Sequence, residues 1–210
     1  MDQSVIDAIA KWPNVPACTG WLLLDRRGQW RMRDDACQAA GELGDPIRHA
    51  ALKAFIERNY ADDEVGRWFF QNGPQRVFVD LAYTPLVLRL HAATDNASAP
   101  ILIDQCGRPF DAQAAWIDDA GNVLFSDSAQ APTGTIALLH DHDLALFSEY
   151  AMLTDDQAGA LLDGTPVAPE NGDADALGTI NWLPKQSIPL LRIRSADVAQ
   201  RFSYVACPVL

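Results

Sequence analysis

The run His140-Asp141-His142-Asp143 places two imidazoles and two carboxylates side by side, and both groups bind metal ions. If the run is extended, His140 and His142 point to the same side and can share one ion. Asp143 or His49 would then supply a third ligand. The simpler alternative is structural, because Asp141 or Asp143 can cap a helix that follows. Both interpretations stay open, with His140, His142 and Asp143 as the candidate metal ligands.

A second group of reactive side chains is basic, although the chain as a whole is acidic. Arg26, Arg27, Arg31 and Arg33 lie close together in the sequence. Guanidinium groups bind carboxylates and phosphates through paired hydrogen bonds, so this segment could recognise a small anionic ligand. The same arginines could instead pair with neighbouring aspartates on a solvated surface. The candidate ligand-binding residues, which include two tryptophans that could also be core residues, are Arg26, Arg27, Arg31, Trp30, Trp68 and Gln71.

The sequence lacks the motifs of common enzyme chemistry. It contains no Gly-x-Ser-x-Gly elbow, no Gly-x-Gly-x-x-Gly loop and no phosphate-loop lysine motif. Its four cysteines show no Cys-x-x-Cys spacing, so they predict free thiols rather than a zinc site or a redox pair. We therefore favour a protein that is not an enzyme, and we predict no cofactor.

Charge and composition exclude several classes of partner. The 210 residues are 49% hydrophobic and carry a net charge of −12. This hydrophobic content is sufficient for a folded core, while the negative charge argues against nucleic-acid binding and against binding to anionic membranes. The sequence has no apolar run long enough to cross a bilayer and no signal-peptide pattern at its start. We expect an acidic, cytoplasmic protein.

Residues 66–82 predict a central β-hairpin around which the other elements are arranged. Asn72-Gly73 tolerates the positive φ of a tight turn, and runs rich in aromatic and β-branched residues flank it. The second run alternates polar and apolar residues, which is typical of a strand with one buried face. The aromatic run 68–70 is therefore expected to fill a core.

Short helices and further hairpins are predicted on both sides of this element. The clearest helix spans 46–60, with Asp45 as its cap and Pro46 in its first turn. The other expected elements are a helix at 2–11, a hairpin at 21–32, a loop at 33–45, strands at 84–90, 101–103, 116–117, 122–125, 135–139 and 189–194, a helix from 141 or 143 to 152, a loop at 163–178 and a helix at 195–202.

Two short sequence patterns that occur in both halves of the chain predict an internal repeat. The turn Asp-x-x-Gly follows an apolar strand at 25–28, 104–107 and 118–121. A proline also leads the strands near 85 and 189. We expect an α+β fold of two small lobes, 1–93 and 94–210, made mainly of antiparallel β-hairpins and joined by a linker at 94–100.

A family resemblance rests on three segments of the first half: 20–30, with its Gly-Trp start, 46–49 and 66–74. In this order they resemble an uncharacterised proteobacterial family of unknown function and, more distantly, another such family. The likeness covers most of 17–90 and, loosely, 185–205. It implies a two-domain, repeat-like, β-rich structure with a link to signalling, and it carries no catalytic residue.

These observations favour a non-enzymatic ligand-binding or regulatory module whose partner is a small anion or another protein. The alternative is a metal-dependent hydrolase that uses His140 and His142. A third hypothesis is a structural protein whose exposed strand edges pair into a homodimer.

Overall fold

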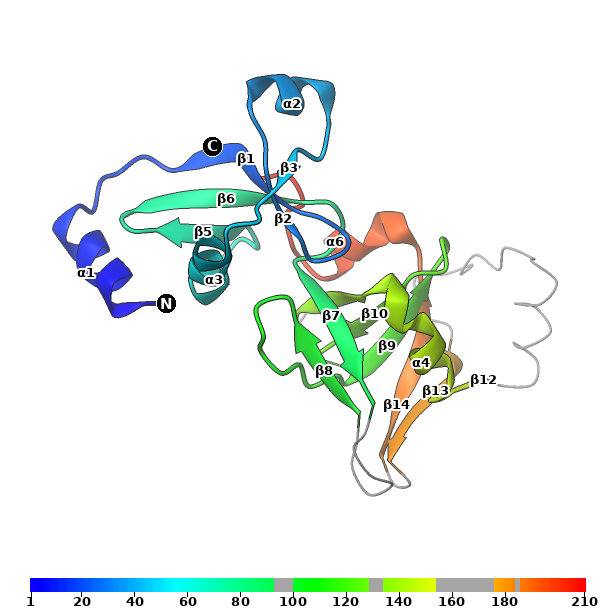
Figure 1. Ribbon diagram of the computed structural model, residues 1–210. Coiled ribbons are helices and arrows are strands. Elements are labelled where there is room, and N and C mark those ends of the chain that lie inside the picture. Colours follow the sequence, from blue (N-terminus) through cyan, green and yellow to red (C-terminus); the bar gives the residue numbers. More distant parts are fainter. Residues whose placement is uncertain (93–99, 129–133, 154–175, 184–185) are drawn as a thin grey trace. The chain divides into compact units, whose positions relative to one another are not determined.

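The chain folds into two mixed β-sheets with a few short helices (Figure 1). The computed structural model describes residues 1–92, 100–128, 134–153, 176–183 and 186–210. Unit 1 comprises Met1–Pro85, Gln105–Gly107 and Ser203–Leu210, and unit 2 comprises Leu86–Asp104 and Arg108–Phe202. The predicted α+β fold of two lobes is confirmed. No helix of the described residues is long and apolar enough to cross a membrane.

Unit 1 contains a six-stranded sheet in the order β3-β2-β1-β6-β5-β4. Its hairpin of β5 and β6 is the predicted central one, and Gly73 occupies the turn with φ 57°. Helix α3 lies against β5, where the rings of Phe55 and Phe70 meet edge to face with centroids 5.3 Å apart. The elements are α1 (Gln3–Lys11), β1 (Cys18–Leu24), β2 (Trp30–Met32), α2 (Asp35–Ala40), β3 (Asp45–Pro46), α3 (Ala50–Arg58), β4 (Tyr60–Asp62), β5 (Trp68–Asn72) and β6 (Gln75–Leu81).

Two sequence predictions for unit 1 are wrong. The expected loop 33–45 contains α2, because the side chain of Asp34 caps it by accepting a hydrogen bond from the Cys37 amide. Asp45 does not cap the next helix, since it pairs with β2 as part of β3. Helix α3 starts at Ala50, and its N-cap is His49, whose side chain accepts a hydrogen bond from the Leu52 amide.

Unit 2 contains an eight-stranded sheet in the order β12-β13-β14-β9-β10-β11-β7-β8. Trp116 lies in its core and donates its indole N–H to Ser126 over 3.0 Å. The elements are β7 (Leu86–His91), β8 (Ile101–Asp104), β9 (Ala114–Asp118), β10 (Val123–Ser126), β11 (Ile136–Leu139), the 3₁₀ helix η1 (Asp141–Asp143), α4 (Leu144–Ser148), β12 (Ala151–Leu153), β13 (Ala176–Leu183), β14 (Gln186–Ile193), η2 (Ser195–Asp197) and α6 (Val198–Arg201).

The boundary between the units differs from the predicted division at residues 93 and 94. Strand β7 belongs to unit 2, because it pairs with β8 and β11 of the second sheet. Most of the predicted linker 94–100 and most of the predicted loop 163–178 lie outside the described residues, but residues 176–178 begin β13. The helix expected to reach Met152 ends at Ser148, and Met152 lies in β12.

The two sheets repeat the same topology. Six strands of unit 2, in the order β11-β10-β9-β14-β13-β12, correspond one by one to the order found in unit 1. The directions also agree, since β1 with β6 and β9 with β14 are parallel, whereas the other corresponding neighbours are antiparallel. This shared order supports the expected internal repeat. The sequence similarity between the two proline-led strands was misleading, because these strands do not occupy corresponding positions: β14 corresponds to β6 and not to β7.

One turn design occurs four times among the described residues, and the sequence predicted three of these instances. In each, an aspartate Oδ1 accepts a hydrogen bond from the backbone amide four residues later, over 2.8 or 2.9 Å. The glycine before that amide has a positive φ between 72° and 79°. A carboxylate and a left-handed glycine thus close each turn together. The turns start at Asp25, Asp63, Asp104 and Asp118, and the one at Asp63 was not predicted.

Candidate functional site

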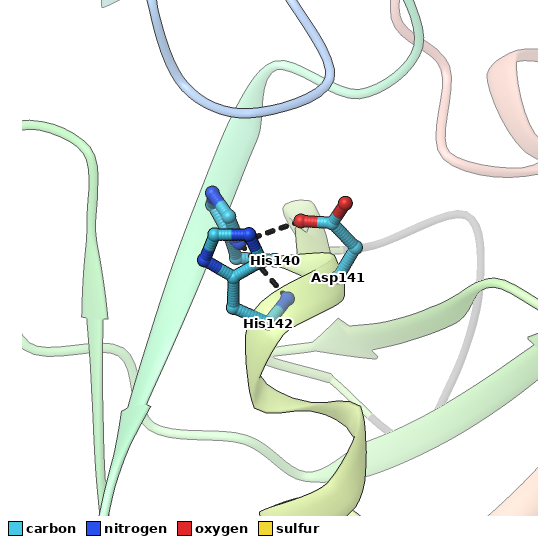
Figure 2. A group of neighbouring side chains, drawn as sticks. All are labelled: His140, Asp141 and His142. Carbon is cyan, nitrogen blue, oxygen red and sulfur yellow. Dashed lines mark hydrogen bonds and ion pairs between the residues drawn. The ribbon is translucent and has the colours of Figure 1, made fainter.

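The histidine run lies in unit 2, directly after β11 (Figure 2). The His140 amide donates to the carbonyl of Leu88 over 2.9 Å, which ties the start of the run to β7. His140 is only 8% exposed, and its Nδ1 accepts a hydrogen bond from the His142 amide over 3.2 Å. His140 therefore caps the 3₁₀ turn. Asp143 occupies the N-cap position of α4, as one of the expected alternatives had it, but its side chain makes no capping hydrogen bond there.

Three side chains of this turn converge, and one of them is not the predicted aspartate. One potential ligand atom from each of His140, Asp141 and His142 lies within 4.8 Å of the others. Oδ1 of Asp141 is 2.9 Å from Nδ1 of His140, as Figure 2 shows. Asp143 instead binds Arg89, while His49 caps α3 in the other unit. The metal site stays a prediction, with Asp141 as its carboxylate.

The surroundings of the turn affect both of its buried titratable groups. Burial is the largest influence on His140 and lowers its pKa; Asp141 acts in the opposite direction, and Arg89 adds to the lowering. Burial also acts to raise the pKa of Asp143. Hydrogen bonds from Arg89 and from the Leu90 amide outweigh that effect, so the pKa of Asp143 is below its usual value.

The basic hairpin of unit 1 uses its arginines mainly within the fold. Arg31 donates to Asp25 over 2.6 Å and to the Gly44 carbonyl over 3.0 Å. Arg26 lies over the ring of Tyr83, 4.4 Å from its centroid, and Arg27 is exposed. Ligand binding by these three arginines stays a prediction.

The other candidate ligand residues of the first unit are buried. Trp30 and Trp68 both pack against Tyr60, with ring centroids 4.9 and 4.8 Å from it. The indole nitrogen of Trp30 has no hydrogen-bond partner among the described residues. Gln71 donates to the Gly73 carbonyl over 2.9 Å. The two tryptophans are thus core residues, as the structural interpretation expected.

Gln71 also lines a surface hollow of about 340 Å³ that the sequence did not predict. Two arginines border it, each stacked on a phenylalanine: Arg67 lies 4.5 Å from the ring centroid of Phe78, and Arg76 lies 4.1 Å from that of Phe69. A second hollow of about 420 Å³, which contains three acidic residues, shares both arginines. The first hollow is lined by Ile9, Pro13, Val15, Ala17, Arg67, Gln71, Pro74, Arg76, Phe78 and Leu210.

The two arginines of this hollow differ in their ion pairing. Arg67 binds Asp63 over 2.8 Å, so its charge is neutralised. No carboxylate of the described residues forms an ion pair with Arg76. The only sequence signal for Arg76 was its place in the alternating strand β6. The hollow itself is formed partly by α1 and the segment after it, which are distant from Arg76 in the sequence.

Two solved structures resemble the chain. One is a DUF1285 family protein from Silicibacter pomeroyi DSS-3, with a TM-score of 0.49 and 14% identity over 87% of this chain and 86% of that one. The other is a DUF1285 family protein from Shewanella baltica OS155, with a TM-score of 0.41 and 14% identity over 61% of this chain and 91% of that one. No curated protein matched the chain.

A family model agrees with the expected membership in a family of unknown function. The model DUF2944, described as "Protein of unknown function (DUF2946)", matches residues 1–209. The match covers both units, so it concerns the repeated architecture as a whole. The chain therefore belongs to this family of proteins of unknown function.

Proposed function

We propose that the protein is a non-enzymatic binding module and that unit 1 binds a small carboxylate with an apolar body. The observation that carries this proposal is the position of Arg76. Its guanidinium borders an open hollow of about 340 Å³ and has no ion-pair partner among the described residues. Hollows that bind small molecules start at roughly this size, at about 300 Å³.

The lining of the hollow fits an amphiphilic anion. Ile9, Val15 and Phe78 offer apolar surface, while Gln71 and Arg76 offer polar groups. An arginine that lies on an aromatic ring keeps its N–H edge available for a carboxylate. The acidic residues near Arg76 line the second hollow, whereas Ile9 of α1 and Val15 line the first, so the apolar body of the ligand would lie against these residues.

Thermal unfolding in the presence of short aliphatic and aromatic carboxylates tests the proposal, with the matching primary amides as uncharged probes. A carboxylate that binds only the folded state stabilises it by about 2.7 kcal/mol at a hundredfold excess over its dissociation constant. We expect carboxylates to raise the unfolding temperature more than amides do. Arg76→Gln should abolish this difference. The exposed Arg48 lies outside the hollow, so Arg48→Gln is the matched control.

Two outcomes would reject this function. One is an equal response of Arg76→Gln and Arg48→Gln to every carboxylate. The other is a wild-type protein that responds to carboxylates and amides alike, because a site built around Arg76 must discriminate by charge.

A further inference from the structure

We propose that the turn His140-Asp141-His142 is a binding site for a divalent transition-metal ion of the Zn²⁺, Ni²⁺ and Cu²⁺ class. This inference is independent of the carboxylate site in unit 1. It starts from the convergence of two imidazoles and one carboxylate, whose potential ligand atoms lie within 4.8 Å of one another. Two nitrogen donors and one oxygen donor suit these ions, whereas Mg²⁺ and Ca²⁺ prefer oxygen donors alone.

The first argument for a cation is the contact between His140 and Asp141. Oδ1 of Asp141 lies 2.9 Å from Nδ1 of His140, a nitrogen that also accepts a hydrogen bond from the His142 amide. The contact brings a carboxylate and an imidazole, two groups that bind transition-metal ions, to one place on the turn. The negative charge of Asp141 also favours a cation there.

The second argument is that the turn is held in place before any ion arrives. Burial fixes the ring of His140, and the bond from the His140 amide to Leu88 fixes the backbone. Asp143 accepts two hydrogen bonds from Arg89 and one from the Leu90 amide, which ties the end of the turn to β7. Ligands that need little reorganisation lose less conformational entropy on binding.

The third argument concerns access and charge. Asp141 and His142 are exposed, so an ion can reach them from solvent. Arg89 would repel a cation, but Asp143 forms a bidentate ion pair with it and compensates its charge. With only three protein ligands, the site leaves coordination positions open to water or to a further ligand, as in other accessible zinc sites.

Calorimetric titration of the whole chain with Zn²⁺, and absorption spectroscopy with Co²⁺ as a coloured substitute, test this site. We expect one ion per chain and Co²⁺ bands typical of nitrogen ligation. His142→Ala and Asp141→Asn should each weaken binding by about tenfold or more, which is the scale even for residues that only support metal ligands. Both side chains are exposed, so these variants should keep the fold.

His91→Ala is the matched control, because His91 is also exposed in unit 2 and is not part of the cluster. Unchanged binding in His91→Ala together with weakened binding in His142→Ala supports the site. The proposal is overturned if the wild-type protein binds no Zn²⁺, or if His142→Ala binds it as well as His91→Ala does. Circular dichroism of each variant separates loss of ligands from loss of structure.

Discussion

Arg89 and Asp143 form a two-bond ion pair that joins β7 to the turn after β11. The guanidinium donates to both carboxylate oxygens, over 2.7 and 3.0 Å, and the Leu90 amide adds a third hydrogen bond over 3.0 Å. The carboxylate is nearly buried, whereas half of the arginine side chain is exposed. The pair therefore acts mainly as an anchor: it satisfies a buried carboxylate and positions the three residues before it.

Replacing Asp143 by Asn should destabilise unit 2. The amide keeps the shape of the side chain but cannot accept two hydrogen bonds from Arg89 and one from Leu90. Hydrogen bonds to charged groups are worth about 1.5–3 kcal/mol, and exposure of Arg89 favours the lower end. Urea unfolding should show a lower midpoint than in the wild type. Asp127→Asn, which changes a carboxylate that accepts from one backbone amide over 2.6 Å, should cost less.

The same aspartate should make stability fall in acid. Its pKa is lower in the folded state, so its contribution is complete above the unfolded value of about 3.9. That contribution is lost as the pH falls through the lower, folded value, because the unfolded chain then binds the proton more readily. Unfolding midpoints measured from neutral to acidic pH should therefore drop more steeply in the wild type than in Asp143→Asn. Parallel curves would contradict this.

The parts of the fold that the sequence predicted well depend on local chemistry. The glycine of Asn72-Gly73 identified the central hairpin, because few other residues adopt its positive φ, although Asn72 itself ends β5 and pairs with Gln75. Asp25 and Asp118 identified two corresponding turns of the repeat for a similar reason. The turn at Asp63 was not predicted, because it lies in an acidic run whose sequence resembles an irregular loop.

Features that depend on distant contacts could not be predicted. Nothing local indicates that β1 pairs in parallel with β6, since that pairing depends on the whole sheet. Arg31 was expected to bind an external anion or a solvated aspartate, but the hairpin places Asp25 beside it. The candidate metal turn was recognised from its composition. That Asp141 rather than Asp143 joins the two histidines could not be predicted, because Asp143 is paired with Arg89, a residue of another strand.

Tyr204 should stabilise unit 1 up to alkaline pH. Its hydroxyl donates to the carbonyl of Tyr83 over 2.8 Å, and burial raises its pKa, while the charge of Arg26 acts in the opposite direction without outweighing burial. Tyr204→Phe removes that hydrogen bond and should cost about 1 kcal/mol at neutral pH. A raised folded pKa means that the contribution is complete below the unfolded value of about 10 and declines above it.

The stability difference between the wild type and Tyr204→Phe should therefore shrink as the pH rises above the unfolded value. Urea unfolding at several alkaline pH values measures it. A difference that stays constant would show that Tyr204 ionises equally well in both states, contrary to its burial.

Gly66 and Gly107 provide a matched test of the recurring turn. Both follow an Asp-x-x pattern, and their φ angles are 79° and 78°. A Cβ at Gly66 would come within 2.0 Å of the Ser203 carbonyl oxygen, whereas a Cβ at Gly107 would have no atom within 4 Å. Gly107→Ala should cost only the left-handed backbone penalty, about 1–2 kcal/mol. Gly66→Ala should cost clearly more, because the segment after Ser203 must move.

The two alanine variants also report on how residues 203–210 are held in unit 1. The Val205 amide donates to the Gly66 carbonyl over 2.9 Å, and the Leu81 amide donates to the Ala206 carbonyl over 2.8 Å. If Gly66→Ala displaces this segment, protease cleavage after residue 203 should become faster, while Gly107→Ala should leave it unchanged. Equal losses of stability and equal cleavage rates in both variants would mean that the approach of Ser203 to Gly66 imposes no constraint.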